Sequence, residues 1–135
     1  MGPKKIMVVD DNQVFLEELK ETLTVAKYKT MAIHDSTKAV DAALAYQPDL
    51  ILLDFMMEGM HGFKVAERLR ESPLTRHIPL IAMSAFLSED HEGMLKEMYG
   101  FRTFLAKPFG AKRMLAEIKN ILNETNQGSN ASGVT

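Results

Sequence analysis

Five polar residues of this sequence stand at the ends of short apolar runs, and their types suit phosphoryl chemistry. They are Asp10, Asp11, Asp54, Ser84 and Lys107. Three carboxylates in one pocket would repel each other unless a cation joined them, and Mg²⁺ is the natural candidate because it prefers oxygen ligands. A carboxylate can also accept a phosphoryl group covalently, while an ammonium and a hydroxyl can bind the oxygens of that group. The residue types therefore predict Mg²⁺-assisted phosphoryl transfer, provided that the chain brings them together.

The apolar runs themselves indicate strands of a parallel sheet. They are Ile6–Val9, Tyr28–Ile33, Leu50–Leu53, Pro79–Ser84 and Thr103–Ala106. Strands that are apolar throughout, rather than alternating with polar residues, are typically buried on both faces. Ligands of an open parallel sheet bind outside the carboxyl ends of its strands. If the strand order is 2-1-3-4-5, the five polar residues converge at one edge of the sheet.

Segments with helical periodicity separate the predicted strands. The first helix is expected at about residues 13–26, with Asp11 or Asn12 as its N-cap. The second is expected after a cap at Ser36 or Thr37, and three more follow the remaining strands. The alternation predicts an α/β, doubly wound sandwich with right-handed crossovers.

Length and composition limit the classes of function. The chain has 135 residues, a net charge of −2 and no cysteine, so neither a nucleic-acid partner, a disulfide nor a thiolate site is indicated. We expect one domain over residues 4–122 and a polar, disordered tail over residues 123–135, because that tail has little apolar surface to bury. No apolar run approaches the ~18 residues of a membrane span, and a cytoplasmic location is expected.

Four stretches in order resemble the receiver domains of bacterial response regulators. They are Val8–Asn12, Leu52–Met57 with Gly59 and Gly62, Met83–Ala85, and Leu105–Phe109. The resemblance covers about residues 4–122. It implies a flavodoxin-like (βα)5 fold with a five-stranded parallel sheet of order 2-1-3-4-5, and a phosphoacceptor function in a two-component system or phosphorelay.

The resemblance also implies roles around the phosphoryl group. Asp54 matches the phosphoacceptor, which also binds Mg²⁺. Asp10 and Asp11 match the acidic pair, with Asp11 the more direct metal ligand. Met56 matches the position whose backbone carbonyl binds the metal, and Lys107 matches the lysine that pairs with these groups.

Three further roles follow from the same resemblance. Ser84 matches the hydroxyl that follows the phosphoryl group, and Phe104 matches the aromatic residue that moves inward on activation. Lys107-Pro108 matches a peptide bond that is usually cis. The implied partners are a sensor histidine kinase or a histidine phosphotransfer protein, and a downstream protein that binds the face of helix 4, strand 5 and helix 5. The resemblance further implies a monomer or a phosphorylation-dependent dimer. It also implies a signalling domain that is not an enzyme for other substrates and catalyses only its own phosphoryl transfer and dephosphorylation.

Some positions depart from the family pattern. Glu58 stands where proline is usual, and His61 stands where aspartate commonly precedes Gly62. The usual glycine-alanine step before the last strand is replaced by Tyr99–Phe101. These departures concern loops and not the residues of the chemistry.

The same residue types also fit several alternative roles. Asp10 and Asp11 alone would serve as an ordinary helix N-cap, and Phe104 could be packed core. A haloacid-dehalogenase-type phosphatase needs Asp-x-Asp after the first strand, and this chain has Asp10-Asp11-Asn12 there. A flavodoxin-like cofactor binder would need a phosphate cradle in that loop. There are two further alternatives. The chain is a receiver that binds partners and is never phosphorylated, or it is part of a longer regulator or hybrid kinase.

Overall fold

A parallel sheet of five strands forms the centre of the molecule. The computed structural model describes residues 2–55, 61–85 and 89–134. The strands are β1 (Lys5–Val9), β2 (Lys29–Ile33), β3 (Leu50–Asp54), β4 (Leu80–Ser84) and β5 (Phe101–Ala106). Their order is β2-β1-β3-β4-β5 and every neighbouring pair is parallel. The predicted fold class and strand order are confirmed.

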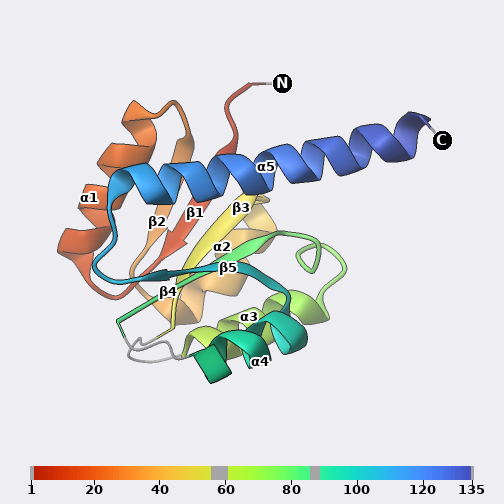
Figure 1. Ribbon diagram of the computed structural model, residues 1–135. Helices are drawn as coiled ribbons and strands as arrows, with labels where there is room; N and C mark the ends of the chain where they lie inside the picture. The colour runs from red at the N-terminus through yellow and green to blue at the C-terminus, as the bar shows by residue number, and fades with distance from the viewer. Residues whose placement is uncertain (1, 56–60, 86–88, 135) are drawn as a thin grey trace.

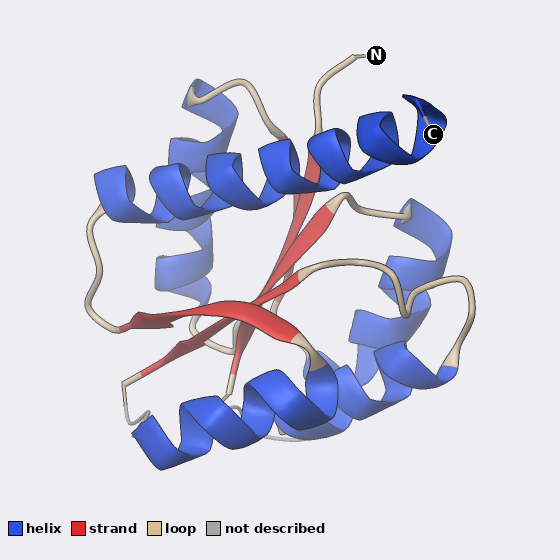
Figure 2. Cartoon of the chain, turned by 45° about the vertical axis from the view of Figure 1, so that its right-hand side comes forward, coloured by secondary structure: helices blue, strands red, loops and turns tan. Residues whose placement is uncertain are grey.

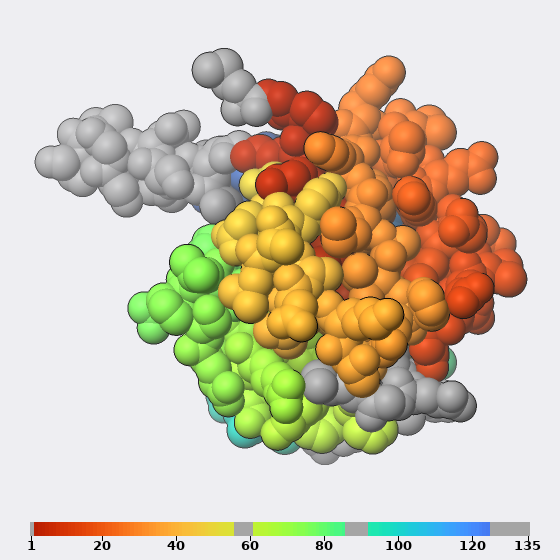
Figure 3. Space-filling view, turned by 180° about the vertical axis from the view of Figure 1, so that it is seen from behind, coloured from red at the N-terminus to blue at the C-terminus, as the bar shows by residue number. Residues whose placement is uncertain are grey.

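Helices cover both faces of this sheet (Figure 1). Within the described ranges they are α1 (Gln13–Val25), a short 3₁₀ turn η1 (Ser36–Lys38), α2 (Ala39–Tyr46), α3 (Gly62–Glu71), α4 (Glu89–Tyr99) and α5 (Ala111–Val134). Helices α1 and α5 pack on one face, and α2, α3 and α4 pack on the other. Figure 2 shows these two layers on either side of the sheet. In the view from behind, α2 lies next to α3 (Figure 3).

Alternate residues of each strand enter two separate cores. In β3, Ile51 and Leu53 pack into the core beneath α2, α3 and α4. Leu50 and Leu52 pack into the core beneath α1 and α5. All four side chains are fully buried. Because successive strand residues point to opposite faces, a sheet with two covered faces needs apolar residues at every position.

The first two helices start in different ways. Asn12 caps α1 as predicted, because its side-chain oxygen accepts a hydrogen bond from the Phe15 N–H at 3.1 Å. The second start differs from the predicted cap at Ser36 or Thr37. Asp35 accepts bonds from the Thr37 N–H and hydroxyl and caps η1, after which α2 begins at Ala39. The Thr37 hydroxyl bond, followed by the backbone bond, lowers the pKa of the Asp35 carboxyl.

The last strand begins earlier than the sequence predicts. It starts at Phe101 and not at Thr103, and Phe101 is almost completely buried in the core beneath α3 and α4. Gly100 ends α4 with a φ of 67°, a left-handed conformation that glycine adopts without strain. The register between β4 and β5 shifts between Leu80 and Ile81, which accommodates the longer strand.

The last helix includes most of the segment for which disorder is predicted. Helix α5 continues to Val134 and extends past the sheet (Figure 1). Once a helix has formed, each further residue adds one backbone hydrogen bond at little cost in nucleation. That residues 123–135 lose their order in solution stays a prediction, which amide exchange can test. No helix in the described ranges is both long and apolar enough to cross a membrane.

Candidate functional site

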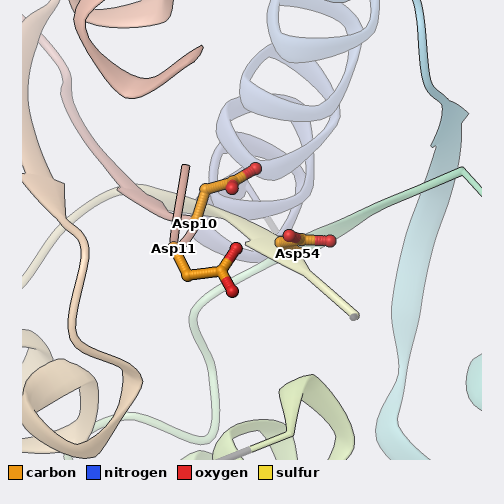
Figure 4. Close-up of side chains that lie close together, drawn as sticks. All are labelled: Asp10, Asp11 and Asp54. Carbon is orange, nitrogen blue, oxygen red and sulfur yellow. The ribbon is translucent and has the colours of Figure 1, made fainter. Parts of the chain in front are cut away.

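The strand order brings three carboxylates to the carboxyl edge of the sheet. β1 and β3 are neighbours, with Val9 opposite Leu53, so Asp10, which follows β1, lies beside Asp54, which ends β3. The Asp10 N–H donates to the Ile33 carbonyl at 3.0 Å, which continues the pairing with β2 beyond β1. Figure 4 shows Asp10 and Asp11 after β1 together with Asp54 at the end of β3.

These carboxylates are close enough to share one cation. One oxygen from each of Asp10, Asp11 and Asp54 can be chosen so that all lie within 4.8 Å of one another. Asp10 is fully buried and Asp54 is 3% exposed, whereas Asp11 is exposed. Buried like charges are costly unless a cation balances them. A set of carboxylate oxygens with one exposed member fits a hard divalent ion such as Mg²⁺, which prefers oxygen and retains water ligands.

Lys107 supplies a positive charge to the same cluster. Its Nζ lies 2.6 Å from Asp10 Oδ2 and 3.3 Å from Asp54 Oδ2. The side chain is 21% exposed, so it is largely sheltered from water. Its backbone N–H donates to the Ser84 carbonyl at 2.9 Å, which fixes the loop after β5 against the end of β4. The Lys107-Pro108 peptide bond is cis.

Asp10 is oriented from both sides of its carboxylate. Oδ1 accepts a hydrogen bond from the Asn12 N–H at 2.9 Å, and Oδ2 accepts one from the Lys107 ammonium. A carboxylate held by two donors keeps one orientation, and bonds to charged donors are the stronger class. Asp10 therefore connects the loop after β1 to the loop after β5.

The two predicted switch residues lie on neighbouring strands. Ser84 ends β4, is 1% exposed and lies opposite Ala106 in the sheet. Phe104 is half-buried on β5, and its ring stacks on Phe101 with centroids 6.2 Å apart. Ser84 thus lies at the same edge as Asp54, while Phe104 packs toward the core beneath α3 and α4. Their role in switching stays a prediction.

The loop after β3 contains one more predicted ligand. Met56 lies outside the described residues, so its carbonyl stays a prediction, as does the effect of Glu58. Beyond the gap, α3 begins at Gly62 against the main chain of β3. A Cβ at position 62 would lie 2.5 Å from the Asp54 carbonyl oxygen and 2.8 Å from Phe55 Cα, so only glycine allows this approach.

One neighbour of the cluster was not expected from the sequence. The Lys107 Nζ lies 4.4 Å from the centroid of the Phe15 ring, and Phe109 meets Phe15 edge-to-face at 5.8 Å. In the sequence, Phe15 is one of several apolar residues at helical spacing on α1. Its spacing indicated only a core-facing position, because the contact with Lys107 joins residues that are far apart in the chain.

Comparisons with known proteins agree with this arrangement. A family model described as the response regulator receiver domain matches residues 6–119. The polar-differentiation response regulator DivK of Brucella anthropi is 30% identical over 122 residues, which cover 90% of this chain and 98% of DivK. A response regulator from Desulfuromonas acetoxidans has 31% identity and a TM-score of 0.81, over 89% of this chain and 97% of that chain. A CheY-like receiver domain protein from Methanospirillum hungatei shares the fold, with a TM-score of 0.86 at 20% identity over 94% and 99% of the two chains.

Proposed function

The chain belongs to the response regulator receiver domain family, and from that premise we propose that Asp54 accepts a phosphoryl group from a phosphohistidine of a partner protein. One observation carries the assignment to this residue. The Lys107 ammonium lies between Asp10 Oδ2 and Asp54 Oδ2, at 2.6 and 3.3 Å. The arrangement joins an acceptor oxygen to a positive charge in a sheltered site, where electrostatic stabilisation is stronger than in water.

The transfer step follows from this geometry. An oxygen of the Asp54 carboxylate forms a bond to phosphorus while the phosphorus–nitrogen bond of the phosphohistidine breaks, and the imidazole nitrogen keeps the electron pair. Lys107 already contacts Asp54, so its ammonium lies beside the oxygens of the arriving group and balances their charge. The Ser84 hydroxyl, at the end of the next strand, is the second group that we assign to those oxygens.

The acidic cluster is the part of the site that would hold Mg²⁺. Asp10, Asp11 and Asp54 would bind it, with the backbone carbonyl of Met56 assigned by the family resemblance alone. When bound, the ion balances negative charge on the transferring group and on the carboxylates. The chain's own contribution is to keep three carboxylates within 4.8 Å of one another before any ion arrives.

We further propose that phosphorylation changes the surface of α4, β5 and α5. The new negative charge on Asp54 would draw Ser84 toward it, and Phe104 would move into the space that Ser84 leaves. Two exposed methionines on α4, Met94 and Met98, supply apolar area to this surface. The proposed phosphodonor is a sensor histidine kinase or a histidine phosphotransfer protein, and a downstream protein, or a second copy after phosphorylation, would bind the changed surface.

Labelling with a small phosphodonor tests the acceptor directly. In acetyl phosphate and Mg²⁺ the parent should gain one phosphoryl group per chain, measured by intact mass. Asp54→Asn should gain none, because an amide cannot form the acyl phosphate. Asp41→Asn, which removes an exposed carboxylate on α2, is the matched control and should label as the parent does. Equal labelling of Asp54→Asn and the parent would end the assignment.

The phosphatase alternative is tested by turnover. A domain that transfers only its own phosphoryl group should not hydrolyse a generic phosphate ester such as p-nitrophenyl phosphate. Release of many product molecules per chain, lost in Asp54→Asn, would favour the phosphatase instead.

A further inference from the structure

The aromatic ring of Phe15 lies next to the Lys107 ammonium. Two carboxylates hold this ammonium, at 2.6 and 3.3 Å, and the face of Phe15 lies 4.4 Å away. A cation within about 6 Å of a ring centroid is attracted by the negative charge above the ring face. The Phe15 ring also packs against Phe109, with the two rings nearly perpendicular, an arrangement that aromatic pairs favour.

The position of Phe15 is tied to the acidic cluster through the backbone. Asn12 accepts a hydrogen bond from the Phe15 N–H through its side chain, and its own N–H donates to Asp10 Oδ1 at 2.9 Å. Asp10 Oδ2 binds Lys107, and Lys107 lies on Phe15. The contacts therefore form a closed circuit of four residues that joins the start of α1 to the loop after β5.

We propose that Phe15 is a positioning residue that holds the Lys107 ammonium beside Asp54 through a cation–π contact. A lysine side chain has a flexible four-carbon stem and loses much conformational freedom when its ammonium is fixed. The carboxylate contacts of Lys107 must change when a phosphoryl group arrives on Asp54, whereas the ring face of Phe15 does not. Phe15 thus keeps the ammonium in place in both states. The inference rests on the proposed function, since it concerns the step in which Asp54 is phosphorylated.

Apolar packing alone is the competing role for this ring. Phe15 and Phe109 also pack against the core beneath α1 and α5. A packing role needs only volume and apolar surface, whereas a cation–π role needs electron density on the ring face. Substituents that withdraw that density while keeping the shape of the ring separate the two roles.

The experiment compares variants of Phe15 in the full chain. The labelling rate with acetyl phosphate and Mg²⁺ is measured for the parent, for 3,4,5-trifluorophenylalanine at position 15, for Phe15→Leu and for Phe15→Tyr. We expect the trifluoro and leucine variants to react about 3- to 10-fold more slowly, which equals about 0.6–1.4 kcal/mol at 1.36 kcal/mol per factor of ten. Phe15→Tyr keeps an electron-rich ring and should stay within about twofold of the parent. The same trifluoro residue at Phe63, an exposed ring on α3, is the control and should leave the rate unchanged.

A second readout does not depend on phosphorylation. In the parent, NMR should show the ε-methylene protons of Lys107 shifted upfield by the ring above them, with and without Mg²⁺. The shift should decrease in the trifluoro variant, because the ammonium leaves the ring face. A trifluoro variant with the parent's labelling rate and an unchanged Lys107 shift would overturn the inference. If the parent itself is not phosphorylated, the proposed function fails. The chemical shift of Lys107 then decides by itself whether Phe15 positions the ammonium.

Discussion

Two cations, Arg70 and Lys107, lie near opposite ends of the same sheet and meet different kinds of partner. Arg70, at the end of α3, donates from Nε to the Tyr99 carbonyl at 2.7 Å and from Nη1 to the carbonyls of Arg76 and Ile78 at 2.7 and 2.8 Å. Lys107 instead lies among carboxylates at the carboxyl edge of the sheet. Burial lowers the pKa of the Arg70 guanidinium, which nevertheless stays charged at neutral pH.

The difference separates a cation bound by main-chain oxygens from a cation bound by carboxylates, to which we assign a function. Arg70 binds main-chain oxygens from the end of α4 and the loop before β4, so it joins neutral groups that have no reaction to perform. Lys107 contacts two carboxylates of a cluster that contains three, those of Asp10, Asp11 and Asp54. Such a cluster is costly to fold and is typical of a site that awaits another charged group. The following changes should affect the two ends of the sheet differently.

The largest expected effect on stability comes from Arg70→Met. The variant removes three hydrogen bonds that a charged group donates. The carbonyl oxygens of Tyr99, Arg76 and Ile78 lose these bonds. We expect the free energy of unfolding to fall by about 2–4 kcal/mol, measured by urea denaturation followed by circular dichroism. Arg70→Lys keeps the charge, but its ammonium cannot reach all three oxygens. Its free energy of unfolding should therefore lie between those of the parent and Arg70→Met. A loss below about 0.5 kcal/mol, the range of ordinary surface substitutions, would contradict the structural role.

Mg²⁺ should stabilise the carboxyl end of the sheet and leave the Arg70 end unaffected. A ligand that binds only the folded state raises the free energy of unfolding by about 1.4 kcal/mol at a concentration of ~10 times Kd. We expect this increase in the parent and in Arg70→Met, if the latter remains folded, and its loss in Asp54→Asn. Because the chain has no tryptophan, binding itself is best measured by calorimetry. An equal increase in Asp54→Asn would place the metal elsewhere.

Removal of one cluster charge should have opposite effects on stability and on function. Asp11→Asn removes an exposed carboxylate whose like-charged neighbours lie within 4.8 Å. In buffer with a chelator we expect stability to rise by about 0.5–1 kcal/mol, because like-charge repulsion at this distance is worth about that much in a high dielectric. In Mg²⁺ we expect labelling to slow by about tenfold, since one proposed metal ligand is lost. A variant that labels at the parent's rate would show that Asp11 is not a ligand.

The smallest expected effect is the pH dependence of the Asp35 cap. The hydroxyl of Thr37, then its N–H, lowers the pKa of the folded Asp35 carboxyl, with smaller help from Lys38 and His34. A group whose folded pKa is depressed stabilises above its unfolded pKa, and that contribution disappears as the pH falls through the folded pKa. The free energy of unfolding is measured by urea denaturation from about pH 6 to about pH 2.5, a range around the ordinary pKa of Asp. We expect it to fall slightly less steeply with decreasing pH in Asp35→Asn than in the parent. Identical curves would indicate that the cap is not formed in solution.

Much of the fold followed from the sequence because burial leaves a direct signal. Leu50–Leu53 was predicted as a strand with two covered faces, and either Asp11 or Asn12 was expected to cap the amphipathic segment that follows. The start of β5 was missed because Arg102 and Gly100 interrupt the apolar pattern, whereas Phe101 is held in the core by contacts across the sheet. The cap at Asp35 was missed because Ser36 and Thr37 are equally good capping residues, and only the backbone decides among them.

The site was predictable to the extent that residue type and strand end determine it. Asp10, Asp54 and Lys107 carry their own chemical signal, and the strand order brings them together. Phe15 and Arg70 carry no such signal. A phenylalanine on a helical apolar face looks like core, and an arginine in the last turn of α3 looks like a solvated charge. Contacts such as those of Arg70 with Tyr99 and of Phe15 with Lys107 join residues far apart in the chain, which spacing along the sequence cannot reveal.

The glycine at the start of α3 has a mechanical consequence. Gly62 lets the helix rest directly on the main chain of Asp54 and Phe55, with no room for even one methyl group between them. Two bodies in such contact cannot slide past each other without one of them giving way. We therefore expect a displacement of the Asp54 main chain toward α3 to move that helix, and a library of all twenty residues at this position should return glycine alone among chains that keep the contact.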